Sequence, residues 1–318
     1  MTRTRELLPA RRAVRRGRSQ LTAARARAVL EMWLGGRCEN TRQSYGRALR
    51  VFTRYLGVRG DVEAVREFLG RGQGHAVELF LGFRGWLADR DYSVATTNAF
   101  LSVLRSISAA ADLVGAADFR VRGGALRAEC YFDVRGPGVE KIRAALRGLA
   151  GRKDARGVRN YALLRLLWDL ALRVGEIQAL ALADLDLRAG TLAVLGKGRR
   201  EKERLTLPPA TRKALRAWLR ARGREEGPLF LGFQPGNRGV GLRLSARSIR
   251  RVTQEMGLGP PHGIRHSAIT AALDATGGDV RAVRVFSRHE KIQTVLIYDE
   301  KRRGEAARVA RLVAAGGR

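Results

Sequence analysis

The chain has 318 residues, of which 45% are hydrophobic, so it is long and apolar enough for two domains with separate cores. Its 61 basic residues outnumber 30 acidic ones, and the formal net charge of +31 indicates a polyanionic partner. Only seven of the basic residues are lysine, and arginine offers phosphate a planar, bidentate fork. A coding bias would explain the ratio of arginine to lysine, but not the twofold excess of base over acid.

Other classes of protein fit the sequence poorly. No run of about 18 apolar residues is present, so no membrane span is expected. The basic N-terminus lacks the apolar core of a signal peptide. Cys38 and Cys130 lie far apart, without the spacing of metal ligands, and indicate a reducing, cytoplasmic setting.

Residues 1–20 carry seven arginines against a single acid, Glu6. Such a run is typical of a basic, flexible, solvated tail. It would equally serve as an arm along DNA phosphates, which adds salt-sensitive affinity but no choice of sequence.

Residues 21–118 predict a small domain of four or five helices. Asn40 is expected to cap a helix whose apolar residues recur at three- and four-residue steps. Asp61 opens a short helix, His75–Leu87 is apolar enough to be buried, and Ser93 caps a further helix. Glycine and proline then break the periodicity in residues 119–138, which we interpret as a linker between domains.

The second half begins with two predicted helices, Val139–Leu149 and Arg159–Leu172, the latter leucine-rich on nearly all sides and therefore buried. Arg173 follows the second helix, and Glu176 comes three residues later. The pair is expected either to stabilise the helix junction as an ion pair or to hold the arginine rigidly toward a phosphate, with Glu176 in a supporting role.

A β-hairpin is predicted next, from Gly190–Leu195 and Arg204–Leu207. Its tip carries Lys197 between two glycines, which would let the backbone approach DNA closely and the ammonium enter a groove. Simple solvated charge is the alternative, and Lys202 is the reserve candidate.

Two basic helices follow the hairpin. Thr211–Arg222 is amphipathic, and Ser245 is expected to cap a helix with an apolar face and with arginines around the rest, namely Arg247, Arg250 and Arg251. Such helices suit major-groove or phosphate contacts, although a solvated basic face would have the same pattern.

The last motifs lie between Pro261 and Tyr298. In P-H-G-I-R-H, His262, Arg265 and His266 fall on one helical face. Two histidines four residues apart can bind zinc, but H-E-x-x-H and further ligands are missing, so no metal site is predicted. His289 follows in F-S-R-H, and Tyr298 comes nine residues later.

These motifs resemble those of the tyrosine recombinase (phage-integrase-type) family. The segment A-L-R-V-G-E-I-Q-A-L around Arg173 is similar to its first arginine box, and H-G-I-R-H to its H-x-L-R-H. Thr41–Tyr45 and Ser93–Asn98 resemble segments of the family's core-binding domain. One departure is F-S-R-H, where the family commonly has L-G-H, which puts the local backbone in question.

The resemblance implies a mainly α fold with a small β-hairpin or sheet, in two domains. Residues 21–118 would form the helical DNA core-binding domain. Residues 139–318 would form the tyrosine-recombinase catalytic domain, ending in a helix from Gly304 to Ala315. That helix would dock on a neighbouring protomer or on its own domain.

The resemblance also implies roles for individual residues. The implied catalytic residues are Arg173, Lys197, His262, Arg265, His289 and Tyr298. The implied DNA contacts are Arg42, Arg47, Arg105, Arg247, Arg250 and Arg251. His266 is expected to be structural.

In this scheme the two catalytic arginines donate hydrogen bonds to the non-bridging phosphate oxygens, and His289 adds a third donor. Tyr298 attacks the phosphorus after His262 takes its proton, and Lys197 protonates the departing 5′ oxygen. The arginines supply the positive charge, so neither a metal nor another cofactor is expected.

The implied partner is double-stranded DNA, bound by a homo-oligomer that is a tetramer in the synaptic complex. The implied function is site-specific recombination through a 3′-phosphotyrosyl intermediate and a Holliday junction. A type IB topoisomerase-like enzyme that nicks and religates DNA, or an inactive DNA-binding homologue, remains an alternative. A metal-dependent nuclease would be distinguished by its loss of activity with a chelator.

Overall fold

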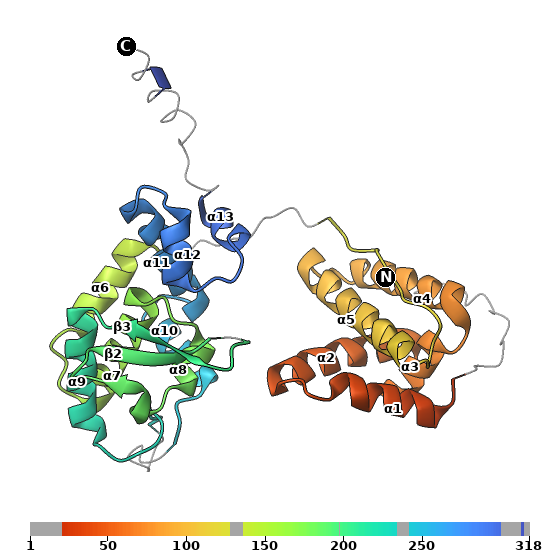
Figure 1. Cartoon of the computed structure of the whole chain (residues 1–318), viewed down its shortest axis with the longest axis horizontal. Helices are drawn as coiled ribbons and strands as arrows, with labels where there is room; N and C mark the ends of the chain where they lie inside the picture. Colours follow the sequence, from red (N-terminus) through yellow and green to blue (C-terminus); the bar gives the residue numbers. More distant parts are fainter. Residues whose placement is uncertain (1–20, 128–135, 197, 234–241, 300–312, 315–318) are drawn as a thin grey trace, which may run out of the picture. The chain divides into compact units, whose positions relative to one another are not determined.

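The computed structural model describes residues 21–127, 136–196, 198–233, 242–299 and 313–314. The chain divides into two compact units, Met1–Tyr131 and Phe132–Arg318, here called the N-terminal and the C-terminal unit (Figure 1). In the described ranges most residues are helical, and a single sheet has three strands. The prediction of a mainly α fold with a small sheet is confirmed.

The N-terminal unit is a bundle of helices around an apolar core. Its described helices are α1 (Ala23–Leu34), α2 (Glu39–Leu56), α3 (Asp61–Leu69), α4 (Gly72–Ala88) and α5 (Val94–Leu113). Aromatic side chains fill the centre, where the Phe52 ring meets those of Phe68 and Phe83 edge to face, with centroids 5.5 and 5.0 Å apart. Such edge-to-face pairs add to the burial of apolar area and fix how the helices pack.

Two predicted caps have different outcomes. Ser93 caps α5 as expected, because its side chain accepts a hydrogen bond from the backbone N–H of Thr96. The cap at Asn40 is wrong: α2 begins at Glu39, so Asn40 lies inside the first turn and Cys38 is the N-cap residue. Glu39 places an acid in that turn, where it interacts favourably with the helix dipole.

The first part of the predicted linker packs on the N-terminal unit. Phe119 and Val121 are buried in its core. The Asn98 side chain donates to the Leu126 carbonyl at 2.9 Å and accepts from the Leu126 N–H at 2.8 Å. Residues 119–127 therefore form a strap fastened to α5, and residues 128–135 lie outside the described part of the chain.

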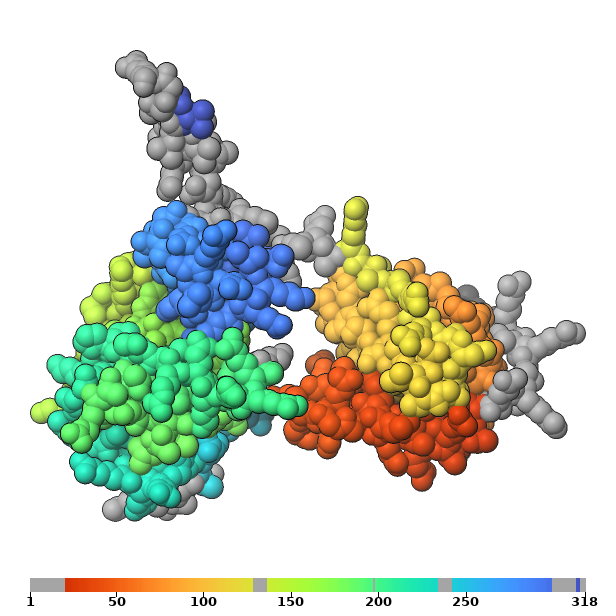
Figure 2. Space-filling model, in the orientation of Figure 1, coloured from red at the N-terminus to blue at the C-terminus, as the bar shows by residue number. Residues whose placement is uncertain are grey.

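The C-terminal unit is built around the leucine-rich helix α7. Its described elements are α6 (Val139–Leu149), α7 (Ala155–Asp169), α8 (Val174–Ala179), a 3₁₀ turn (Leu182–Asp184), β1 (Leu185–Asp186), β2 (Thr191–Leu195), β3 (Lys202–Thr206), α9 (Pro209–Arg222), α10 (Ala246–Glu255), α11 (Pro261–Ala275), α12 (Val280–Ser287) and α13 (Gln293–Asp299). Helix α7 packs against α6, α9 and α11. Helices α11, α12 and α13 gather at one end of this unit, and Figure 2 shows the blue surface that they form there.

The sheet of the C-terminal unit is antiparallel, in the order β1-β2-β3. Leu195 pairs with Lys202, so the predicted hairpin is present. Leu192 and Val194 of β2 point into the core, as the alternation of a half-buried strand requires. Strand β1 was not predicted, because two residues are too few for a periodic pattern.

Helix α7 differs from its predicted bounds at both ends. It starts at Ala155, where Asp154 caps it by accepting from the Gly157 N–H, and it ends at Asp169 rather than at Leu172. Ala171 has a φ of 46°, a left-handed conformation that stops the helix. The segment between α7 and α8 is therefore a tight turn, and its carbonyl groups are available to other parts of the site.

Other expectations also concern residues outside the described part. These are the basic tail of residues 1–20, Cys130, Lys197, and most of the helix expected from Gly304 to Ala315, of which only residues 313–314 are described. Among the described residues, no helix is both long and apolar enough to cross a bilayer.

Candidate active site

Five predicted site residues come together in the C-terminal unit. Arg173 is the N-cap residue of α8, His262 and Arg265 lie on α11, His289 follows α12, and Tyr298 lies on α13. Helix α11 is the common neighbour, since it contacts α7, α12 and α13.

Helix α11 is held in place by the end of the predicted linker. The Gly138 N–H donates to Ser267 Oγ at 3.2 Å. A side chain at Gly136 would collide with the Gly263 carbonyl and with Ser267, so only glycine allows this close approach. Residues 136–138 therefore fix the helix that carries His262 and Arg265.

Arg265 is buried, with 2% of its surface exposed. Its guanidinium donates to the carbonyls of Ala171 and Ser287, and Nη2 lies 3.4 Å from His289 Nε2. Burial lowers the pKa of Arg265 to about 9, with further contributions from the charges of Arg173 and Arg288. The group stays protonated at neutral pH, and backbone carbonyls fix its orientation.

Arg173 and Glu176 form a capping box. The backbone N–H of Arg173 donates to Glu176 Oε2 at 2.9 Å, and Nη1 donates to Oε1 at 2.7 Å. The Glu176 side chain is 3% exposed, whereas that of Arg173 is 30% exposed. Burial opposes the charge of Glu176, but Arg288 and Arg173 outweigh it and lower the pKa of the carboxyl group. The ion pair and an accessible guanidinium thus coexist.

His289 is neutral at physiological pH. Burial, Arg265 and Arg173 together lower its pKa to about 4. Its Nδ1 lies 2.9 Å from Ser287 Oγ, which itself donates to the Arg284 carbonyl at 3.3 Å. Because that hydroxyl proton is used, the geometry favours Nδ1–H as the donor to Ser287 and leaves Nε2 to accept from Arg265.

Tyr298 lies inside the cluster, with 5% of its surface exposed. Its ring centroid is 6.2 Å from that of His289 and 5.0 Å from that of His266. Burial raises the pKa of the phenol, and the charges of Arg265 and Arg173 partly oppose that shift. Both guanidinium groups therefore act electrostatically on the phenol, which is protonated at neutral pH.

The ring of His262 contacts that of His266, which in turn contacts that of Tyr298. The ring centroids of His262 and His266 are 4.0 Å apart, in an edge-to-face arrangement. Burial, Arg265 and Arg173 lower the pKa of His262, so that its basic form predominates at neutral pH. His266, expected to be merely structural, has its ring between those of His262 and Tyr298.

The lysine candidates differ. Lys197 lies outside the described residues. Lys202, the reserve candidate, forms an ion pair with Asp184, whose side chain is 7% exposed. The ammonium of Lys202 is thus paired with a buried carboxylate of the same unit.

Sequence reasoning missed Arg288 as a site residue. Its side chain is 5% exposed, and Nη2 donates to Glu176 Oε2 at 3.0 Å. The signal was present in F-S-R-H, where an arginine stands in place of the family's glycine. In the sequence this arginine indicates only a change in the local backbone, and so the contacts of its side chain were not predicted.

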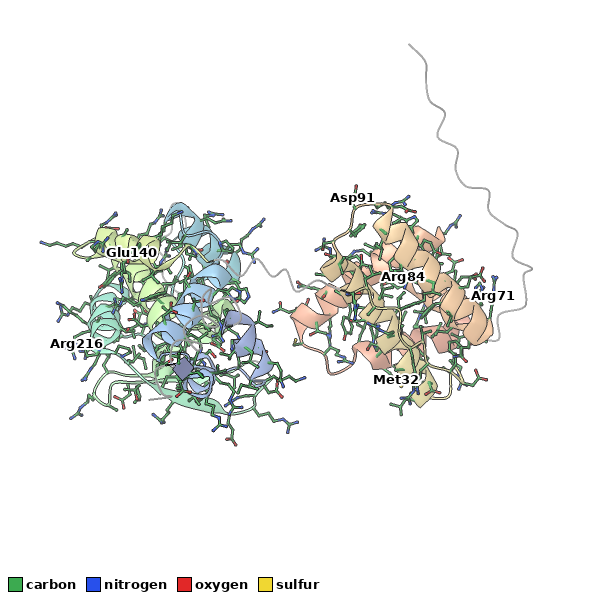
Figure 3. The ribbon with its side chains drawn as sticks, turned by 90° about the horizontal axis from the view of Figure 1, so that it is seen from above. Met32, Arg71, Arg84, Asp91, Glu140 and Arg216 are labelled. Atoms are coloured by element: carbon green, nitrogen blue, oxygen red, sulfur yellow. The ribbon has the colours of Figure 1, made fainter. Side chains whose placement is uncertain are left out.

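The predicted DNA contacts separate into two groups. Arg42 and Arg47 are exposed on α2, and Arg247, Arg250 and Arg251 are exposed on α10. The α10 arginines line a shallow groove with Val174, the residue after Arg173. Arg105 instead donates to the Gly123 carbonyl at 2.7 Å and fastens the strap. Figure 3 shows further nitrogen-tipped side chains around both units, among them Arg216 of α9.

In the part of the chain that the structure describes, no three histidine, cysteine, aspartate or glutamate side chains are grouped so that they could hold a metal ion.

The fold and the site thus define a helical unit in which a tyrosine, three histidines and several arginines converge. Residues 138–305 match the phage integrase family. A tyrosine recombinase of Synechococcus elongatus, Synpcc7942_B2651, is 37% identical over 289 residues, which cover 86% of this chain and 89% of the relative. The tyrosine recombinase slr0733 of Synechocystis is 32% identical, covering 87% and 91%. The chain belongs to the phage integrase family and is a tyrosine recombinase.

Solved structures share the fold. The Tn1549 transposon integrase in complex with circular intermediate DNA has a TM-score of 0.64 at 15% identity, covering 87% of this chain and 95% of that one. The XerH recombinase bound to a palindromic difH substrate, a post-cleavage complex, has a TM-score of 0.61 at 18% identity, covering 90% and 84%.

Proposed function

We propose that this protein recombines DNA at specific sites by transesterification through Tyr298. The observation that carries the proposal is the burial of the Tyr298 phenol among Arg173, Arg265 and His289, in a unit of strongly basic surface. The names of the relatives, and the DNA in the XerH and Tn1549 integrase structures, support double-stranded DNA as the partner.

In the proposed reaction, the Tyr298 oxygen attacks a phosphodiester and the bond from phosphorus to the 5′ oxygen breaks. The products are a 3′-phosphotyrosyl enzyme and a free 5′-hydroxyl. Arg173 and Arg265 donate hydrogen bonds to the non-bridging oxygens. Such preorganised donors are worth about 3–4 kcal/mol each in comparable oxyanion sites.

His289 has a second function in this scheme. In the free enzyme its Nε2 accepts from Arg265 and so helps to orient that guanidinium. A bound phosphate would raise the pKa of the imidazole, because the anion favours the charged form. His289 would then hold a proton on Nε2 and become the third donor to the phosphate.

Proton transfer completes the step. Tyr298 has a raised pKa, so its attack at neutral pH requires a base, and we assign that role to His262. The order of the rings, His262, His266 and Tyr298, supports a route for the proton through His266. Lys197 would give a proton to the departing 5′ oxygen.

Strand exchange follows when the 5′-hydroxyl of a second DNA attacks the phosphotyrosyl bond. The energy of the phosphodiester bond is retained, so the scheme needs no ATP, and the arginines supply the positive charge that a metal would bring. In our proposal four protomers act on two DNA sites through a Holliday junction.

The proposed DNA contacts come from both units. Residues 21–118 form the core-binding domain, with Arg42 and Arg47 on phosphates. Arg247, Arg250 and Arg251 of α10 bind beside the cleaved bond. Topoisomerase-like nicking and religation remains the second candidate, because it would use the same cleavage chemistry.

The proposal is tested with nicked suicide duplexes cut from the DNA that flanks the protein's own gene. We expect a covalent protein–DNA adduct that persists in a chelator. It should be absent from Tyr298→Phe and present in Tyr161→Phe, a control at another tyrosine of the same unit. An adduct in Tyr298→Phe would refute the assigned nucleophile. Two intact sites in one reaction should give Holliday junctions, whereas relaxation of plasmid without junctions would favour the topoisomerase alternative.

A further inference from the structure

Arg288 is a buried cation that the proposed reaction does not use. It ends α12 with a φ of 54°, a left-handed conformation that glycine adopts most easily. Its side chain is nevertheless buried, with 5% exposed. Both features are unfavourable for an arginine unless its contacts compensate for them.

The contacts of Arg288 join two segments of the site. Nη1 donates to the Leu170 carbonyl at 3.0 Å, and Nη2 donates to the Ala171 carbonyl at 3.3 Å. Both carbonyls belong to the tight turn that leads to Arg173. Nη1 also donates to the Phe286 carbonyl at 3.2 Å, in the last turn of α12. The guanidinium therefore ties the end of α12 to the turn before α8.

Arg288 and Arg173 also share one carboxylate. Arg288 Nη2 donates to Glu176 Oε2 at 3.0 Å, while Arg173 Nη1 donates to Oε1 at 2.7 Å. In return, Arg173 Nη2 donates to the backbone carbonyl of Arg288 at 3.3 Å. The Arg173 guanidinium is thus held on two sides by groups whose positions depend on Arg288.

The turn at residue 288 orients its neighbours as well. The Ser287 carbonyl, just before Arg288, accepts a hydrogen bond from the Arg265 guanidinium. His289, just after Arg288, has its Nε2 3.4 Å from Nη2 of Arg265. A glycine would make this turn without strain. The guanidinium of Arg288 is therefore what distinguishes this site from one with glycine at that position.

We propose that Arg288 is a positioning residue, a third arginine that holds Arg173, Glu176 and His289 in the geometry for DNA cleavage without touching the DNA. This inference rests on the proposed function. Residues that fix a reacting group matter because even a displacement of about 1 Å can slow a reaction by roughly 100-fold.

The decisive variant is Arg288→Gly, because glycine keeps the left-handed turn and removes the guanidinium. We expect the adduct to form about 100-fold more slowly on the suicide duplex. Arg281→Ala is the control, since Arg281 is an exposed arginine of the same helix and its loss removes the same charge. Equal rates in these two variants would overturn the inference. Should Arg288→Gly not fold, Arg288→Lys replaces it in the same comparison, with partial loss expected because an ammonium keeps the charge but not the fork.

A second readout tests whether Arg288 acts on His289 in the folded protein. The charged and titratable groups that act on His289 are Arg265, Arg173, Arg288 and His262. In Arg288→Gly, NMR titration should show the pKa of His289 raised above about 4, because burial and the other three groups still lower it but the charge of Arg288 is gone. An unchanged His289 titration would count against the inference.

A double-mutant cycle tests whether Arg288 acts through Glu176. The effects of Glu176→Gln and Arg288→Gly on the rate of adduct formation should be far from additive, because both break one shared contact. Additive effects would contradict the shared contact. If the wild type forms no adduct on any duplex, the proposed function fails. If the wild type reacts and Arg288→Gly reacts equally well, only the role of Arg288 fails.

Discussion

Glu176 accepts two hydrogen bonds from Arg173, one from the backbone N–H at 2.9 Å and one from Nη1 at 2.7 Å. The carboxylate is buried, while the guanidinium keeps a partly exposed side. One residue thus begins helix α8 and presents a cation to solvent. The capping box that starts α8 holds the Arg173 guanidinium rigidly. Glu176 is therefore as important to the site as Arg173.

Replacing Glu176 by glutamine should therefore destabilise the protein. The amide side chain would keep the volume but leave two guanidinium groups without their common counter-charge. We expect a loss of about 3 kcal/mol at pH 7, the low end for a broken buried pair, because Arg173 is 30% exposed. Urea denaturation measures it, with Glu140→Gln as control, since Glu140 is 79% exposed in its pair with Arg143. A loss no larger than that of the control would contradict the prediction.

The same variant has a predicted pH dependence. Glu176 has a folded-state pKa below its usual 4.5, so its contribution to stability is complete above about pH 4.5 and is lost as the pH falls through the folded pKa. The stability gap between wild type and Glu176→Gln should therefore narrow below pH 4.5. A gap that stays constant down to about pH 3 would show that the pKa is not lowered.

His289 gives a second pH dependence, in a different window. Its folded pKa is about 4 against 6.5 ordinarily, so the unfolded chain takes up the proton first and stability falls as the pH drops from 6.5 toward 4. His289→Gln lacks this titration, whereas His262 titrates in both proteins. We expect the wild type to lose stability faster than His289→Gln between about pH 7 and pH 5 in urea denaturation. Parallel curves would refute the lowered pKa.

The sequence predicted the helices, and which residues come together in the site, better than it predicted the contacts between those residues. Periodicity located α6, and Ser93 and Ser245 marked the starts of α5 and α10, because such caps are strong local signals. The end of α7 was missed, because the left-handed turn at Ala171 has no glycine to mark it. Arg288 was missed for the same reason: tertiary contacts, rather than local propensity, hold an arginine in that conformation.

The arginines of the N-terminal unit should differ in their effect on DNA binding. Arg42 and Arg47 are exposed on α2, whereas the Arg105 guanidinium donates to Gly123. Arg42→Ala and Arg47→Ala should each weaken binding and reduce the salt slope by about 0.9 per phosphate contact. Arg105→Ala should leave the salt slope unchanged. It should lower the free energy of opening the strap, residues 119–127, by about 1 kcal/mol.

Fluorescence anisotropy across a salt series measures the slopes, and hydrogen exchange of residues 119–127 measures the strap. The three variants lose the same charge, so each serves as a control for the others. A salt slope reduced as much in Arg105→Ala as in Arg42→Ala would place Arg105 on the DNA instead.

The identity of the general acid can be decided with a sulfur leaving group. Lys197→Ala should slow cleavage of ordinary DNA by about 10²- to 10⁴-fold, because the 5′ oxygen leaves poorly without a proton. A duplex with sulfur at the bridging 5′ position should restore the rate, since a thiolate departs unprotonated. Lys202→Ala breaks the ion pair with Asp184 and should cost about 1 kcal/mol of stability, with equal effects on both substrates. Rescue of Lys202→Ala by sulfur would instead make Lys202 the acid, and rescue of neither would mean that another group protonates the 5′ oxygen.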